Sequence, residues 1–412
     1  MKKLDWPILD KPEMLVLLLL VASVLSLTGV GNTRVTDVVI LAAAAGLVAS
    51  WIIGTDNHIR LPRSIILPVA IIWCLFLLSS ITAGPYVPES ALRAIVAIIV
   101  SGTGIFIIPE IYSRRSFFWH ILLISFALGL LSILAVITPF ESVGSIELLR
   151  TVPYDQFVVF GPQKYAPVPV GGLGNPNILA MTLLPGILAG ANFLYERAAE
   201  HSTWGVFSFG VVTAVPTIIL FLTRSRGALL ALAAGVVMYV VVHNLSSVTV
   251  RILCLCGITG TVLFLAPTGI GPIPSLVEAV SAPRAFRWRH ALDAILQQPL
   301  LGYGVGNSRT IIPEFQTQPH NAYFMIGTWS GVGAAISYLY LFTQMLLLSV
   351  RRKVGTTPAV FPAILTSYWV ISIFESLTIF HLTIYSIVLA ITFGFVASDI
   401  VPHERATTSN SN

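Results

Sequence analysis

Apolar segments long enough to cross a lipid bilayer recur along almost the whole of this chain. A membrane-spanning helix needs about 20 predominantly apolar residues. The candidate segments are residues 14–31, 35–54, 64–83, 91–108, 117–139, 176–195, 204–222, 227–243, 250–267, 322–349, 358–376 and 380–398. Only 10% of the residues are charged, whereas a soluble domain carries about 25%. The sequence therefore predicts an all-α polytopic membrane protein with about twelve transmembrane helices.

We expect a single transmembrane domain over residues 1–399 and a polar cytoplasmic tail at residues 400–412. Two long loops, residues 140–175 and 268–321, belong to the transmembrane domain and lie on the outer side. The second of these loops, between spans nine and ten, is long enough to fold and is predicted to be helical. In such a membrane protein the net charge of +5 does not indicate a nucleic-acid partner, and none is expected.

Basic residues near the ends of spans predict the orientation, because Lys and Arg are enriched on the cytoplasmic side of a membrane. When both termini are placed in the cytoplasm, Arg197, Arg251 and the Arg351-Arg352-Lys353 turn all fall on that side. The short outer loops then hold few basic residues. The pair Arg224 and Arg226 is the exception.

These two arginines occur in Thr223-Arg224-Ser225-Arg226-Gly227, where two spans leave almost no loop between them. Arginine at this depth is costly unless the side chain reaches the interface or binds an anion. One interpretation is that both side chains reach out to lipid phosphates. The other is that they hold phosphate oxygens of a ligand, since guanidinium offers paired, permanently charged donors.

A second group of arginines lies in the outer loop 268–321, where Pro283 and Pro299 bracket a predicted helix over residues 284–298. Its expected apolar face consists of Phe286, Ala291, Ile295 and Leu296. Arg284, Arg287 and Trp288 share a face at helical spacing, while Arg289 points elsewhere. One interpretation is an interfacial helix with its tryptophan at the headgroup level. The other is that the helix provides a second set of contacts to phosphate or sugar.

Two glycine-rich motifs border spans. Gly302-Tyr303-Gly304-Val305-Gly306 lacks the lysine and the strand of a nucleotide loop, so a hinge or a tight turn is predicted. Gly171-Gly172-Leu173-Gly174 precedes Asn175-Pro176-Asn177, which predicts the start of a helix. Asn177 either belongs to the cap of that helix or hydrogen-bonds a sugar.

The motif Gln318-Pro319-His320-Asn321-Ala322-Tyr323 places a histidine where the long loop enters an apolar span. His320 has no partner at metal-ligand spacing, so no metal is predicted. It is either a structural hydrogen-bonding group or a base that nearby cations keep neutral. Glu375, late in the eleventh span, would either neutralise an arginine or orient His320. The sequence alone does not decide between these two roles of Glu375.

Taken together, these motifs resemble the O-antigen ligase and O-antigen polymerase superfamily, bacterial glycosyltransferases that use a lipid carrier. The resemblance rests on Ser225-Arg226-Gly227-Ala228, on residues 284–288 followed by Pro299-Leu300-Leu301-Gly302-Tyr303-Gly304, and on His320-Asn321-Ala322-Tyr323. It covers roughly residues 170–345. Upstream, the first five spans match in hydropathy alone.

The resemblance implies an enzyme of lipopolysaccharide biosynthesis in the bacterial inner membrane, with a periplasmic active site. Its donor would be an undecaprenyl-diphosphate-linked glycan and its acceptor the lipid A core or another glycan, without cofactor or metal. His320 matches the family's essential histidine, and Arg226 and Arg284 match its arginines. Arg224, Arg287 and Arg289 lie beside these positions. Asn321, Tyr323 and Asn177 complete the predicted substrate contacts.

The predicted mechanism is a direct, inverting displacement at the anomeric carbon, with His320 as general base and the arginines holding the diphosphate. A double-displacement hydrolase is disfavoured because the outer loops show no pair of catalytic carboxylates. Of the two branches, ligase is preferred over polymerase, since the second outer loop is one compact segment and the chain is short. Rival interpretations are a transporter, which predicts related halves with broken helices, and a scaffold protein with replaceable arginines.

Overall fold

The computed structural model of the 412-residue chain describes residues 11–28, 33–53, 62–137, 142–143, 146–147, 149–153, 165–265, 273–307, 318–350 and 359–398. The predicted tail at 400–412 and the basic turn at 351–353 lie outside these ranges.

Hydrophobic helices dominate the described part of the chain. Eight of them are long and apolar enough to cross a membrane, namely Arg34–Ile53, Arg63–Ile81, Gly84–Ile111, Arg114–Leu134, Pro176–Ala199, Thr203–Leu222, Arg226–Asn244 and Ala322–Ser349. Shorter apolar helices cover Pro12–Leu25, Ser247–Thr261, Val360–Phe374 and Ile384–Ser398. Every predicted span overlaps one of these helices, so the predicted class, an all-α polytopic membrane protein, is confirmed.

The chain divides into two compact units, and each is described by itself. The first comprises Met1–Ile59, Ile99–Leu229 and Ile379–Gly394. Its elements are α1 (Lys11–Leu25), α2 (Thr33–Ile53), the π-helical turn η2 (Thr103–Ile107), α5 (Ile108–Ile111), α6 (Arg114–Ile137), α7 (Pro176–Ala199), α8 (Thr203–Leu222) and most of α15 (Ile384–Ser398).

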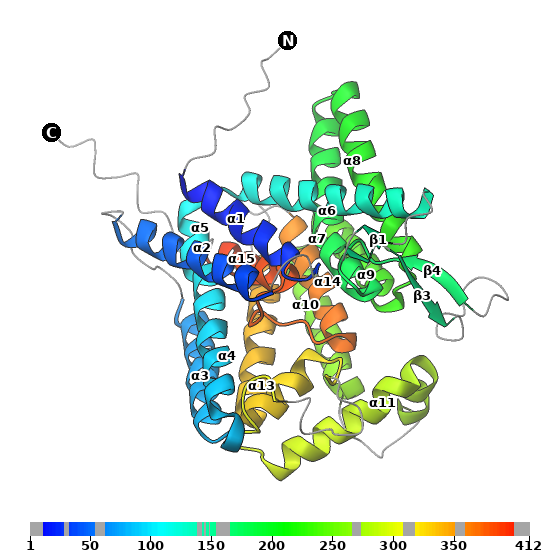
Figure 1. The fold of residues 1–412 in the computed structure, drawn as a ribbon. Helices are drawn as coiled ribbons and strands as arrows, with labels where there is room; N and C mark the ends of the chain where they lie inside the picture. Colours follow the sequence, from blue (N-terminus) through cyan, green and yellow to red (C-terminus); the bar gives the residue numbers. More distant parts are fainter. Residues whose placement is uncertain are drawn as a thin grey trace. The chain divides into compact units, whose positions relative to one another are not determined.

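Within the first unit, α6, α7 and α8 pack against one another (Figure 1). Glycines on α7 allow this approach: a Cβ atom at Gly186 would collide with Ser125 of α6, and one at Gly190 with Thr213 of α8. Small residues at helix interfaces let backbones come close where the bilayer offers no hydrophobic driving force.

Two antiparallel ribbons in the long loop 140–175 add strands to a fold predicted to be wholly helical. The first pairs β1 (Ser142–Val143) with β2 (Ile146–Glu147). In the second, β3 (Leu149–Pro153) pairs with β4 (Tyr165–Pro169), and Leu149 stands opposite Pro169.

The second unit comprises Arg60–Ile98, Leu230–Thr378 and Phe395–Asn412. Its elements are α3 (Arg63–Ile81), the 3₁₀ turn η1 (Gly84–Tyr86), most of α4 (Val87–Gly102) and α9 (Arg226–Asn244), α10 (Ser247–Leu265), α11 (Ile273–Gln297), α13 (Ala322–Ser349) and α14 (Val360–Phe374).

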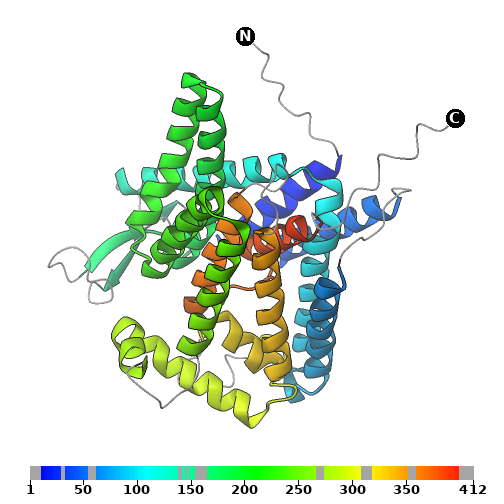
Figure 2. The same cartoon turned by 180° about the vertical axis from the view of Figure 1, so that it is seen from behind.

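The core of the second unit forms around α13, which contacts α3, α10, α11 and α14; α3 lies alongside it in both views (Figure 2). Aromatic rings fill the contacts. The ring of Trp369 on α14 lies 5.2 Å from that of Phe342 and 5.6 Å from that of Tyr323. Phe76 of α3 meets Trp329 edge-on at 6.1 Å.

The helix α11, from the long loop between the predicted ninth and tenth spans, is longer than predicted. It begins at Ile273, so Pro283 lies inside it and does not mark its start. A proline removes one backbone hydrogen bond and disfavours an interior position without forbidding it, which makes it an ambiguous start signal. The predicted apolar face is also partly wrong: Ala291 and Ile295 are buried, whereas Phe286 is 42% and Leu296 65% exposed.

The predicted tenth span is interrupted. Within α13, Ser330 (φ −143°, ψ 22°) and Gly331 (φ 82°, ψ 177°) have non-helical backbone angles. The glycine loop, which we define as residues 298–306, contacts this break. The loop therefore does more than make the tight turn that its sequence predicts.

Candidate functional site

His320 stands immediately before α13 with a left-handed backbone angle (φ 51°). The next residue, Asn321, caps the helix: its Oδ1 accepts hydrogen bonds from the backbone N–H groups of Tyr323 and Phe324, each at 3.0 Å. Its Nδ2 donates to the carbonyl oxygen of Ile373 at 2.9 Å. Asn321 thus ties the start of α13 to the last turn of α14, which brings His320 beside Glu375.

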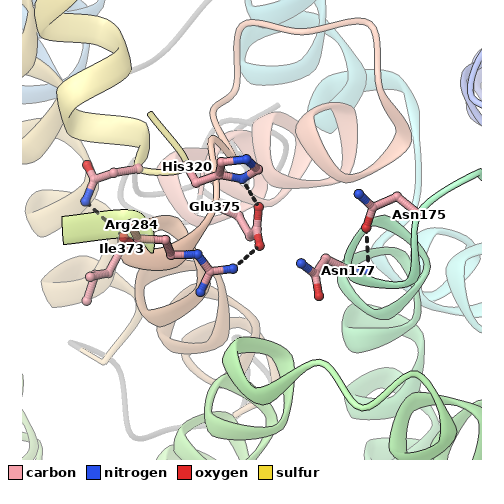
Figure 3. A network of polar contacts seen from close by, with 7 residues as sticks. Asn175, Asn177, Arg284, His320, Ile373 and Glu375 are labelled. Carbon is pink, nitrogen blue, oxygen red and sulfur yellow. Dashed lines mark hydrogen bonds and ion pairs between the residues drawn. The ribbon is translucent and has the colours of Figure 1, made fainter. Parts of the chain in front are cut away.

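The Glu375 carboxylate bridges two cationic or titratable groups from different elements. Its Oε1 accepts from Arg284 Nη2 of α11 at 2.8 Å, and its Oε2 lies 2.9 Å from His320 Nδ1 (Figure 3). The Glu375 side chain is only 8% exposed, whereas those of Arg284 and His320 are 26% and 31% exposed. Both roles that the sequence left open for Glu375, neutralising an arginine and orienting the histidine, are therefore observed together.

This contact determines which imidazole nitrogen can accept a proton. An ionised carboxylate only accepts hydrogen bonds, so we assign the proton of the neutral ring to Nδ1. Nε2 then carries the lone pair and is the nitrogen able to act as a base. The arrangement of base and orienting carboxylate follows the same logic as in hydrolase triads.

The remaining cations of α11 have different surroundings. Arg287 is half-buried; burial and the positive charge of Arg284 lower the pKa of its guanidinium, while Glu375 opposes that shift. Arg289 is exposed, in agreement with its predicted separate direction. Trp288 is only 6% exposed and its ring lies 6.1 Å from that of Phe324. Trp288 therefore anchors α11 on α13.

Two of the predicted substrate contacts are engaged in the protein interior. The side chain of Asn321 is 0% exposed and uses its oxygen and nitrogen in the contacts described above. Tyr323 is 7% exposed and lies among the aromatic rings of α13 and α14. We therefore assign both residues to holding His320 in place and leave them out of the substrate contacts proposed below.

The other predicted residues belong to the first unit. Arg224 is half-buried with a left-handed angle (φ 56°), and Arg226, the exposed first residue of α9, follows it after the buried Ser225. The turn is closed by Thr223, whose hydroxyl accepts from the Ser225 N–H at 3.3 Å. Arg224 thus lies in the tight turn between α8 and α9, and Arg226 begins α9, so almost no loop separates the two helices, as predicted.

The predicted helix start before α7 is confirmed. Asn175 is its cap: Oδ1 accepts from the backbone N–H of Asn177 at 2.8 Å (Figure 3). Asn177 itself is half-buried in the first turn. No group of three or more His, Cys, Asp or Glu side chains that could hold a metal occurs among the described residues.

Sequence reasoning did not find the tether between Asn321 and Ile373 or the double contact of Glu375. The one available signal was Glu375 itself, because an acid inside an apolar segment needs partners. Its partners could not be identified, since they lie 55 and 91 positions away along the chain.

Comparison with known proteins adds one match. A family model described as O-antigen ligase matches residues 209–339, a range that includes both arginine groups and His320 but not Glu375. A search of curated proteins found no match. The match over residues 209–339 confirms the resemblance of this chain to the O-antigen ligase and polymerase superfamily.

Proposed function

We propose that this protein is an O-antigen ligase that transfers a glycan from undecaprenyl diphosphate to a lipid A-core acceptor at the periplasmic face of the inner membrane. The observation that carries the proposal is the arrangement of His320, Glu375 and Arg284, which combines a base with a free ring nitrogen and a fixed cation. The family match supports the same reaction class.

In the proposed step, His320 Nε2 removes the proton from an acceptor hydroxyl. The acceptor oxygen forms a bond to the anomeric carbon while the bond from that carbon to the diphosphate oxygen breaks. The electron pair of the broken bond leaves with the lipid diphosphate. Because the attack and the departure occur on opposite sides of the carbon, the configuration inverts.

The arginines stabilise the negative charge of the diphosphate as it leaves. Arg284 donates to Glu375 through Nη2, and its guanidinium has further N–H donors for phosphate oxygens. The other proposed phosphate ligands are Arg287 and Arg289 from the same helix, Arg224 from the turn before α9, and Arg226 at the first position of α9. Asn177 is the proposed sugar contact.

Reconstitution of the purified protein with donor and acceptor tests the proposal. A ligase attaches glycan to lipid A core and leaves other donor molecules unextended. A polymerase lengthens the glycan on the carrier without lipid A core, and that product would replace the ligase assignment. Uptake of a solute into liposomes without any glycan transfer would favour a transporter and exclude both enzymes.

A further inference from the structure

The break in α13 exposes backbone groups that a continuous helix would satisfy internally. Non-helical backbone is tolerated at membrane depth only where protein or water supplies the missing hydrogen bonds. Here residues of the glycine loop supply them. Tyr303 N–H donates to the Thr328 carbonyl at 2.9 Å, and Gly304 N–H to the Trp329 carbonyl at 2.9 Å.

On the C-terminal side of the break, the helix is the donor and the loop is the acceptor. The Val332 N–H donates to the Pro299 carbonyl at 2.8 Å, so the loop contacts both halves of α13. The Ser79 hydroxyl of α3 also donates to the Trp329 carbonyl. The loop and the broken helix therefore form one interlock, which we define as residues 298–306 together with residues 328–332.

Two glycines make this interlock sterically possible. A Cβ atom at Gly302 would lie 2.6 Å from the Thr328 oxygen, and one at Gly331 would lie 2.5 Å from the Pro299 oxygen. Both residues also have left-handed backbone angles, φ 61° and 82°. Neither backbone can move away without breaking the hydrogen bonds that join the loop to the helix.

The interlock is connected to the candidate site through α11. From Arg284 the helix runs along the first half of α13: Trp288 packs beside Phe324, and Ile295 covers Gly327. The chain then enters the glycine loop, where Gln298 N–H still bonds to the Ala294 carbonyl at 3.1 Å. A shift of the loop along α13 would therefore move Arg284 relative to His320.

A third element holds the far end of the loop. Arg93 of α4 donates through Nη1 to the Gly306 carbonyl at 2.8 Å, and its Nη2 pairs with Glu89 at 2.5 Å. These contacts fix the loop between the α3–α4 hairpin and α13.

We propose that Gly302, Gly331 and Arg93 are positioning residues, whose interlock sets the register of α11 on α13 and hence the place of Arg284 beside His320. The inference rests on the function proposed above. Displacements of about 1 Å at reacting groups can cost on the order of 10²-fold in rate. The interlock is thus expected to control turnover although none of its residues belongs to the substrate contacts proposed above.

The test compares Gly302→Ala and Gly331→Ala with Gly84→Ala in the full-length protein. Gly84 is a matched control because its φ is +60° and a Cβ atom there has open space. We expect kcat for glycan transfer to fall about 10²-fold in the two interlock variants and to stay near the wild-type value in Gly84→Ala. Wild-type kcat in folded Gly302→Ala and Gly331→Ala would overturn the proposal.

A double-mutant cycle separates positioning from general damage to the fold. In the Arg284→Lys background, Gly302→Ala should lower kcat much less than it does in the wild-type background. The guanidinium that the glycine substitution would displace is already absent from that background. Equal losses in both backgrounds would contradict the proposed route through Arg284. If neither glycine variant folds, Arg93→Ala decides instead, since it removes the Gly306 contact without inserting an atom; an unchanged kcat there would equally refute the proposal.

Failure of the proposed function would look different. If His320→Ala and Arg284→Ala transfer glycan normally, the reaction does not use this site at all. If both lose activity while the interlock variants keep it, only the positioning inference is wrong.

Discussion

At the scale of single residues, the contact between Glu375 and His320 leaves the imidazole Nε2 as the only proposed base. We expect His320→Ala to lower turnover by about 10²–10⁴-fold, the usual share of general base catalysis, while donor binding is retained. His320→Gln should be equally poor, because an amide cannot take up a proton. An active glutamine variant would assign His320 a structural role.

A second prediction at the scale of residues concerns the arginines proposed to bind the diphosphate. Arg226→Ala and Arg284→Ala should abolish transfer without loss of expression, because each removes charged donors to the diphosphate. Arg226→Lys should also be poor, since an ammonium cannot reproduce the forked geometry. Arg251→Ala, on the predicted cytoplasmic side, is the control and should be active. Full activity of Arg226→Ala would indicate an arginine that only reaches lipid phosphates.

At the scale of elements, two asparagines begin helices but differ in what else they hold. Asn175→Ala should lose only a cap, which costs about 0.5–2 kcal/mol. Asn321→Ala also leaves the Ile373 carbonyl without its donor, which adds about 1–3 kcal/mol. Thermal unfolding should therefore show the larger loss for Asn321→Ala, with transfer reduced as well. Equal destabilisation would argue that the tether to α14 contributes nothing.

The elements also show what a sequence can and cannot predict. Each span could be located because hydropathy is a local property, and Asn175 could be predicted as a helix start from its neighbours. The break at Ser330 and Gly331 could not, because its hydrogen bonds come from residues 299–304, in a separate segment of the chain. Residues of the site were identified by type, but their mutual contacts depend on how α11, α13 and α14 pack.

At the scale of the whole molecule, the predicted orientation can be tested by labelling single cysteines in a background without Cys74, Cys254 and Cys256. Tyr86→Cys, in the turn after α3, should react with an impermeant reagent added from outside. Glu200→Cys, between α7 and α8, should react only after the membrane is opened. The reverse pattern would place the site on the cytoplasmic face and exclude a periplasmic donor.

The bridge formed by Glu375 has a consequence for bioenergetics. In the proposed step, the proton taken from the acceptor adds one positive charge to the group formed by Arg284, Glu375 and His320. Under the predicted orientation that proton both arrives from and departs to the periplasm. No charge crosses the bilayer, so the membrane potential performs no work on the reaction. Transfer should consequently continue at the same rate after an ionophore has collapsed the proton-motive force.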